Sequence, residues 1–138
     1  MDNWKKIAKE VKKKREKYFK GIKHQKKSKE FEKKYGFRYE DTWELDYSFY
    51  LWIVPRLVYL KENRCGSPVI LEPKDGDYTN FPSDENDKAW DIILDKMING
   101  FYYGGIVDGV GILKEDNHEK ELEEAFELLA KYHSCLWD

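Results

Sequence analysis

The chain of 138 residues has little cysteine, little proline and no long apolar run. Its two cysteines, Cys65 and Cys135, are too few for a disulfide framework or for a thiolate metal site. No apolar segment follows the basic amino-terminal residues, so we expect no signal peptide. The longest apolar stretch, residues 45–60, contains an acid, a proline and an arginine and is shorter than the ~20 residues of a membrane-spanning helix. The sequence therefore predicts a cytoplasmic protein without a membrane span.

The chain is rich, by contrast, in aromatic residues and in charge. Aromatic residues make up 16% and charged residues 38%, which is typical of one hydrated globular domain and not of a disordered chain. The charges are unevenly spread: residues 1–40 hold 16 Lys and Arg against 6 Asp and Glu, whereas the rest hold 9 against 21. Parts of opposite charge attract each other, within one chain or between copies, and we expect a homo-oligomer.

Apolar residues recur at helical spacing along most of the chain, which predicts an all-α fold. We expect a small helical bundle with a kinked central helix, a long Pro/Gly loop and a basic N-terminal helix. The basic N-terminal helix is assigned to residues 1–35, with a fragile stretch after Phe19 or Lys23. The helical core domain is assigned to residues 36–138.

The central helix is predicted over residues 42–62. Asp41 is a suitable N-cap, with Glu44 three residues later as its capping-box partner, and Pro55 should kink the helix. Because apolar residues occupy nearly every face, we expect this helix to be the buried centre of the bundle.

A loop rich in proline and glycine over residues 63–82 precedes a helix that begins at Ser83 or Asp84. Its apolar stripe is the clearest periodic signal in the chain: Ala89, Trp90, Ile93, Leu94, Met97, Ile98 and Phe101. The glycine-rich residues 99–111 are expected to break regular structure. A last helix, capped by Asp116 or Asn117, is expected to run to about Leu136.

Asp46 and Arg56 are charges within the helix that is predicted to be most buried. A buried charge is costly unless it is paired. The two residues are about 15 Å apart along a straight helix, from its rise of ~1.5 Å per residue, so they cannot pair with each other. Each needs a ligand, another helix or another subunit. The alternative is a partner within the same chain. Asp46 would then accept from Tyr hydroxyls or backbone donors, and Arg56 would pair with an acid of the last helix.

Two further sets of residues suit ligand binding. Trp43, Tyr47, Tyr50 and Val54 share one helical face, which suits either the stacking of a nucleobase or packing in the core. Arginine side chains are planar forks that suit phosphate groups or ordinary ion pairs. The candidate ligand-binding residues are therefore Trp43, Asp46, Tyr47, Tyr50, Arg56, Arg38 and Arg64.

The lysine-rich N-terminus, which includes residues 12–15 and 26–27, has several interpretations. It suits nucleic acid, an anionic membrane surface, the acidic part of a neighbouring chain, or simple solvation. The histidines and cysteines are too dispersed to predict a metal site, and no nucleophile motif or triad is present. We expect no cofactor and no enzymatic activity.

Part of the chain resembles a family of small tailed-bacteriophage proteins of unassigned function. The resemblance lies in Asp41-Thr-Trp-Glu-Leu-Asp-Tyr47, Pro55-Arg-Leu57, Lys61-Glu62, Gly66-Ser-Pro68 and the final Leu136-Trp-Asp138. It spans about residues 36–138. The lysine-rich N-terminus and the glycine-rich stretch after Phe101 fall outside the pattern.

The resemblance implies a phage protein that opposes host defence in the bacterial cytoplasm. Some proteins of this kind sequester nucleotide immune signals, so the implied ligand is cyclic ADP-ribose or a related nucleotide, bound without catalysis. Asp46 would accept a hydrogen bond from a ribose hydroxyl or an adenine amine, and Trp43 or Tyr47 would stack on the base. Arg38, Arg56 or Arg64 would neutralise phosphate.

Two other hypotheses remain open. The main alternative is an interaction protein that inhibits a host defence protein or binds nucleic acid through its basic N-terminal helix. A structural or packaging protein, whose oppositely charged parts drive assembly, is the third.

Overall fold

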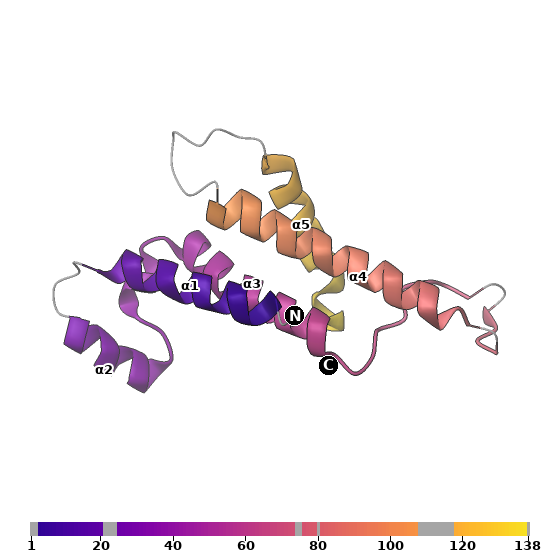
Figure 1. Ribbon diagram of the computed structural model, residues 1–138, viewed down its shortest axis with the longest axis horizontal. Coiled ribbons are helices and arrows are strands. Elements are labelled where there is room, and N and C mark those ends of the chain that lie inside the picture. Colours follow the sequence, from indigo (N-terminus) through magenta and orange to yellow (C-terminus); the bar gives the residue numbers. More distant parts are fainter. Residues whose placement is uncertain (1–2, 21–24, 74–75, 80, 108–117, 138) are drawn as a thin grey trace.

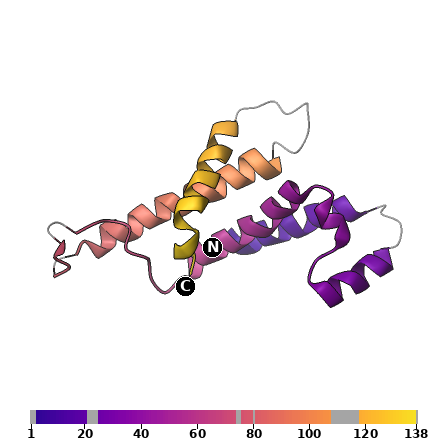
Figure 2. The same ribbon diagram turned by 180° about the vertical axis from the view of Figure 1, so that it is seen from behind.

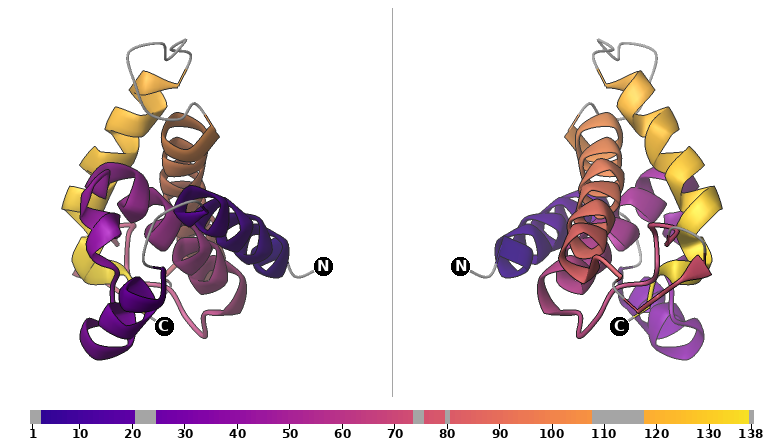
Figure 3. Two further views of the ribbon diagram at one scale, coloured as in Figure 1. Left: turned by 90° about the vertical axis from the view of Figure 1, so that its left-hand side faces the viewer. Right: turned by 90° about the vertical axis from the view of Figure 1, so that its right-hand side faces the viewer.

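The computed structural model describes residues 3–20, 25–73, 76–79, 81–107 and 118–137, and it confirms the all-α class (Figure 1). The elements in chain order are α1 (Asn3–Phe19), α2 (Gln25–Tyr35), η1 (Tyr39–Thr42), α3 (Leu45–Asn63), α4 (Ser83–Asn99), η3 (Gly100–Val107), α5 (Glu119–Tyr132) and η4 (His133–Cys135). None of these residues is in a strand. In the end-on views, α1 and α5 lie on opposite sides of α3 and α4 (Figure 3).

The apolar stripe predicted for residues 83–101 forms the centre of the core. Trp90, Leu94, Met97 and Phe101 are completely buried. The other elements add Val11 from α1, Tyr50, Leu51, Ile53, Val54, Leu57 and Val58 from α3, Ile106 from η3 and Ala125 from α5. Seen from behind, α5 crosses α4 (Figure 2). No helix in the described part of the chain combines the length and the apolarity needed to cross a membrane.

The glycine-rich stretch does not break the helix in the residues that the structure describes. α4 passes directly into η3, which is a π-helix over Gly100–Val107. A Cβ atom at Gly104 would lie 2.8 Å from the Leu122 Cβ, and one at Gly105 would lie 2.5 Å from the Tyr50 ring. Glycine is therefore required because α5 and α3 pack directly on the η3 backbone. For residues 100–107 the prediction of a break was wrong, because it considered the conformational freedom of glycine and not its small size. Residues 108–111 of the predicted stretch lie outside the described residues.

The last helix begins at Glu119, with His118 as its N-cap, and ends at Tyr132, after which η4 follows. The predicted caps Asp116 and Asn117 lie outside the described residues. The helical stripe is confirmed at Ala125, which is fully buried.

One side chain holds the Pro/Gly loop against α4. Asn86 is buried and accepts hydrogen bonds from the backbone N–H groups of Ile70 at 2.7 Å and Leu71 at 2.9 Å. It donates to the Pro68 carbonyl at 2.8 Å. Loop backbone that packs against a helix needs partners for its polar groups, and Asn86 supplies three of them.

The N-terminal 35 residues form two helices where one was predicted. α1 ends at Phe19 as expected, but the stretch expected to be fragile contains α2. α2 is held by two ion pairs of Glu32, to Arg15 at 2.7 Å and to Arg38 at 2.9 Å. Because Val11 belongs to the core, α1 packs as part of the bundle. The domain boundary at residue 36 stays a prediction.

The central helix begins later than predicted and is not buried on every side. Asp41 lies inside η1 as the third residue after its N-cap, Arg38, and its carboxylate accepts the Arg38 N–H at 3.0 Å. The N-cap of α3 is Glu44. The helix runs through Pro55 to Asn63. Its exposed face carries Leu45, Trp52 and Tyr59 at seven-residue spacing, and Trp52 is 52% exposed.

Candidate functional site: a pocket between α1 and α3

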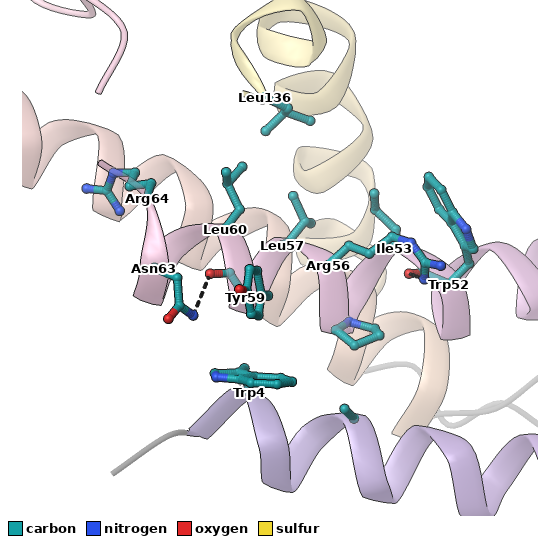
Figure 4. A pocket seen from close by; sticks show the side chains of 12 residues that line it. Trp4, Trp52, Ile53, Arg56, Leu57, Tyr59, Leu60, Asn63, Arg64 and Leu136 are labelled. Atoms are coloured by element: carbon teal, nitrogen blue, oxygen red, sulfur yellow. Dashed lines mark hydrogen bonds between the residues drawn. The ribbon is translucent and has the colours of Figure 1, made fainter. Parts of the chain in front are cut away.

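A pocket of about 550 Å³ lies along α3, between the start of α1 and Leu136 (Figure 4). Such a volume is typical of small-molecule sites, which occupy ~300–1,000 Å³. The lining residues are Trp4 and Ala8 of α1, Leu136, and Trp52, Ile53, Pro55, Arg56, Leu57, Tyr59, Leu60, Asn63 and Arg64. We call this site the α1–α3 pocket.

Trp4 and Tyr59 form an aromatic wall at one end of the pocket. The backbone N–H of Trp4 donates to Glu62 Oε2 at 3.1 Å, which fixes the start of α1 on α3. The two rings meet edge to face, with centroids 4.8 Å apart and planes at 83°. Asn63 Nδ2 donates to the Tyr59 carbonyl at 3.0 Å (Figure 4).

Arg56 supplies a positive charge beside the second tryptophan. Its guanidinium lies 4.5 Å from the centre of the Trp52 ring, and Nη1 donates to the Trp52 carbonyl at 2.7 Å. Among the described residues, no carboxylate forms an ion pair with Arg56. Partial burial lowers its pKa, but an arginine remains protonated in proteins. The pocket therefore carries a cation that no described acidic residue neutralises.

Arg64 lies at the end of the pocket opposite Trp52 (Figure 4), and its side chain is held by contacts within the fold. Its Nη2 pairs with Asp91 Oδ1 at 2.7 Å, and its other groups donate to the Lys61 carbonyl at 2.8 Å and to Ser67 Oγ at 3.2 Å. These contacts tie α3 to α4 and to the loop. Arg64 is therefore part of the wall, whereas Arg56 has donors to offer.

A second cavity of about 530 Å³ adjoins the first, and Trp52 and Arg56 line both. Three of its charged residues pair with one another: Arg15 Nη2 lies 2.7 Å from Glu32 Oε1 and 3.3 Å from Asp41 Oδ2. Burial raises the pKa of Glu32, but the hydrogen bonds from Arg38 and Arg15 outweigh it, and the pKa is lowered overall. The ion pairs hold α1, α2 and η1 together.

The structure brings only two of the predicted ligand-binding residues, Arg56 and Arg64, into the α1–α3 pocket. Arg38 pairs with Glu32 and stacks its guanidinium 4.6 Å from the Phe19 ring centre. The prediction that Asp46 and Arg56 are buried is wrong, since both residues are exposed.

The three predicted aromatic residues do not form one stacking face. Trp43 precedes α3 and is 60% exposed. Tyr47 is half-buried, with its ring 6.0 Å from that of Tyr18. Tyr50 is buried and stacks near Phe101, with centroids 6.1 Å apart. The alternative of core packing therefore holds for Tyr50.

The sequence did not predict three of the pocket residues, which are Trp4, Trp52 and Tyr59. One signal was available: Trp52 and Tyr59 are seven residues apart, and Arg56 lies between them on the same helical face. Trp4 had no such signal, because only the packing of α1 on α3 brings it to the pocket.

The lining suits binding more than bond making. It contains no His, Cys, Ser, Thr, Asp or Glu among its described residues, so the usual nucleophiles and general bases are lacking there. No group of three or more potential metal ligands occurs in the described ranges. In comparisons with known proteins, no protein-family model, no curated protein and no solved structure matches the chain. The chemistry of the pocket is therefore the basis for a functional proposal.

Proposed function

We propose that the protein binds a nucleotide-type small molecule in the α1–α3 pocket and holds it without converting it. The observation that carries the proposal is Arg56: a guanidinium at an aromatic pocket, with no carboxylate pairing with it in the part of the chain that the structure describes. Arginine binds phosphate through paired N–H donors. A ligand that combines an anionic group with a planar ring matches both features of the pocket.

The aromatic walls supply the second half of recognition. Trp4, Trp52 and Tyr59 offer ring faces or edges to a base, and stacking of this kind contributes ~1–3 kcal/mol per base. Asn63, whose amide nitrogen is bonded to the Tyr59 carbonyl, offers its oxygen to an adenine amine or a ribose hydroxyl. All of these residues come from one chain, so one copy supplies a complete pocket.

Capture without conversion lowers the concentration of a free nucleotide. The resemblance to tailed-bacteriophage proteins gives this activity a setting, in which a cytoplasmic phage protein sequesters an immune signal such as cyclic ADP-ribose or a related nucleotide. This class of ligand contains both a base and phosphate groups. The aromatic rings of the pocket suit the base, and Arg56 suits the phosphate groups.

Calorimetric titration tests the proposal directly. The ligands are cyclic ADP-ribose, ADP-ribose and AMP, with adenosine as the control that lacks phosphate. We expect heat from at least one phosphorylated ligand and much weaker binding of adenosine. Replacement of Arg56 by glutamine should weaken binding by about tenfold or more, since a hydrogen bond to a charged group contributes about 1.5–3 kcal/mol.

Two further variants locate the site. Trp52→Ala should weaken binding, whereas Tyr78→Ala, which removes an exposed aromatic ring outside the pocket, should not. Point variants are preferable to removal of residues 1–35, because that deletion takes away Trp4 and Ala8. The proposal fails if no nucleotide gives heat or if Arg56→Gln binds as tightly as the unchanged chain.

A further inference from the structure

A second surface, outside the lining of the α1–α3 pocket, combines exposed aromatic rings with exposed lysines. We call it the aromatic patch, and it consists of Phe31, Tyr35, Phe37, Tyr39 and Trp43. Four of the five rings are at least 38% exposed, and only Phe31 is half-buried. None of the five lines the α1–α3 pocket.

The patch is one continuous set of rings. The Phe31 ring is at its centre, with centroids 4.6 Å from Tyr35, 5.6 Å from Phe37 and 5.9 Å from Tyr39. Tyr39 in turn lies 6.0 Å from Trp43. α2 and η1 follow each other in the chain, so rings from α2, from η1 and from the residues beside η1 meet in one cluster. A contiguous exposed apolar patch marks a binding surface.

The charges around the patch are positive. The five lysines of α2 are all exposed: Lys26, Lys27, Lys29, Lys33 and Lys34. In the described ranges, none of them forms an ion pair. Lys34 Nζ lies 5.2 Å from the centre of the Tyr35 ring.

The nearby acids are mostly withdrawn from this surface. Glu32 and Asp41 pair with Arg15, and Glu40 is buried, where its carboxylate accepts the Ser28 hydroxyl. Glu30, Glu44 and Asp46 are other acids close in sequence to the rings. The lysines therefore dominate the charge around the patch.

From this arrangement we infer that the aromatic patch and the α2 lysines bind single-stranded nucleic acid. Non-specific binding of single strands combines a cationic track along the phosphates with aromatic rings on which bases stack. A protein partner fits less well, because lysine is depleted from the centre of protein interfaces. A duplex fits less well too, because its base faces are already stacked.

The test is fluorescence anisotropy of the whole chain with a labelled oligothymidylate of roughly 12 nucleotides, within the length that such surfaces cover. We expect binding that weakens with salt and that exceeds binding to a duplex of the same length. Trp43→Ala should weaken binding by about 5- to 150-fold, the factor that corresponds to one lost stacking contact. Tyr35→Ala should act in the same direction, and provides a second variant if either one folds poorly.

Trp137→Ala is the matched control, because it removes a tryptophan that is also about half exposed but lies outside the patch. Replacing Lys33 and Lys34 by glutamine should reduce the slope of log K against log salt by about 1.4, at ~0.7 per phosphate contact. The inference is overturned if the strand does not bind at low salt, or if both aromatic variants bind as the unchanged chain does. Equal competition by polyglutamate, with no effect of Trp43→Ala, would show a general attraction of polyanions and would also overturn it.

Discussion

The two sides of this bundle use aromatic residues in opposite ways. Around α4 and η3, Trp90 and Phe101 are completely buried, and glycines let the neighbouring helices pack on the backbone. On the side of α1, α2 and α3, Trp43 and Trp52 are more than half exposed, and arginines and lysines surround them. The comparison shows that aromatic content alone does not identify a core. An aromatic residue stabilises the fold where neighbouring helices cover it, and it is available to a ligand where they do not.

The largest expected effect contrasts one tryptophan from each side. Trp90→Ala removes a completely buried ring and should lower the free energy of unfolding by about 3–5 kcal/mol. Trp52→Ala removes a half-exposed ring and should change it by less than about 0.5 kcal/mol. Urea denaturation followed by circular dichroism measures both, and equal losses for the two variants would contradict the comparison.

A pair of glycines tests the close packing of η3. Gly105→Ala places a Cβ atom 2.5 Å from the Tyr50 ring and should destabilise by about 1–3 kcal/mol through overpacking. Gly66→Ala, in the loop, meets no atom within 4 Å and has no positive φ, so it is the matched control. Thermal unfolding of the two variants gives the difference. A neutral Gly105→Ala would mean that α3 does not pack on η3 as described.

The loop anchor is expected to have a smaller effect. Asn86→Ala removes three hydrogen bonds and leaves two loop amides without their protein acceptor, at a cost of about 1–2 kcal/mol. Amide hydrogen exchange of Ile70 and Leu71 should become faster, while exchange in α5 changes little. Unchanged protection at both amides would show that the loop has another support.

The smallest expected effect concerns the ion pairs that hold α2. The pKa of Glu32 is lowered in the folded state, so its stabilisation is present above the unfolded pKa and is lost as the pH falls through the folded pKa. Glu32→Gln should therefore destabilise by less than about 1 kcal/mol at neutral pH, because the carboxylate is partly exposed. At acidic pH the variant and the unchanged chain should converge. Stability curves against pH for both proteins check this, and a gap that persists in acid would contradict it.

The part of the fold that was predicted most accurately is the one with the strongest periodic pattern in the sequence. The stripe of α4 was predicted from helical spacing, and Trp90, Leu94 and Met97 are all buried. The start of α3 was placed too early because Asp41 belongs to a capping box of the short helix η1, whose N-cap is Arg38, and local capping signals do not show which helix they serve. The continuous helix from α4 into η3 was missed because close packing on Gly105 depends on Tyr50, which is distant in the sequence.

The candidate site was only partly predictable. Arg56 was identified because a charge in an apolar helix is unusual, and it does line the pocket. Asp46 was selected for the same reason and is exposed outside it, because a helix with apolar residues on nearly every face gives no indication of which face lacks a neighbour. Trp4 joins the pocket through a contact with Tyr59 across 55 positions of sequence, which no local pattern contains.

The central claim is that the α1–α3 pocket is a nucleotide-binding site, and a crystal structure grown with ADP-ribose tests it most directly. The account predicts a phosphate within hydrogen-bonding distance of the Arg56 guanidinium and a base against Trp4, Trp52 or Tyr59. If a second copy of the chain fills this pocket, or if the nucleotide binds elsewhere on the molecule, the claim is contradicted.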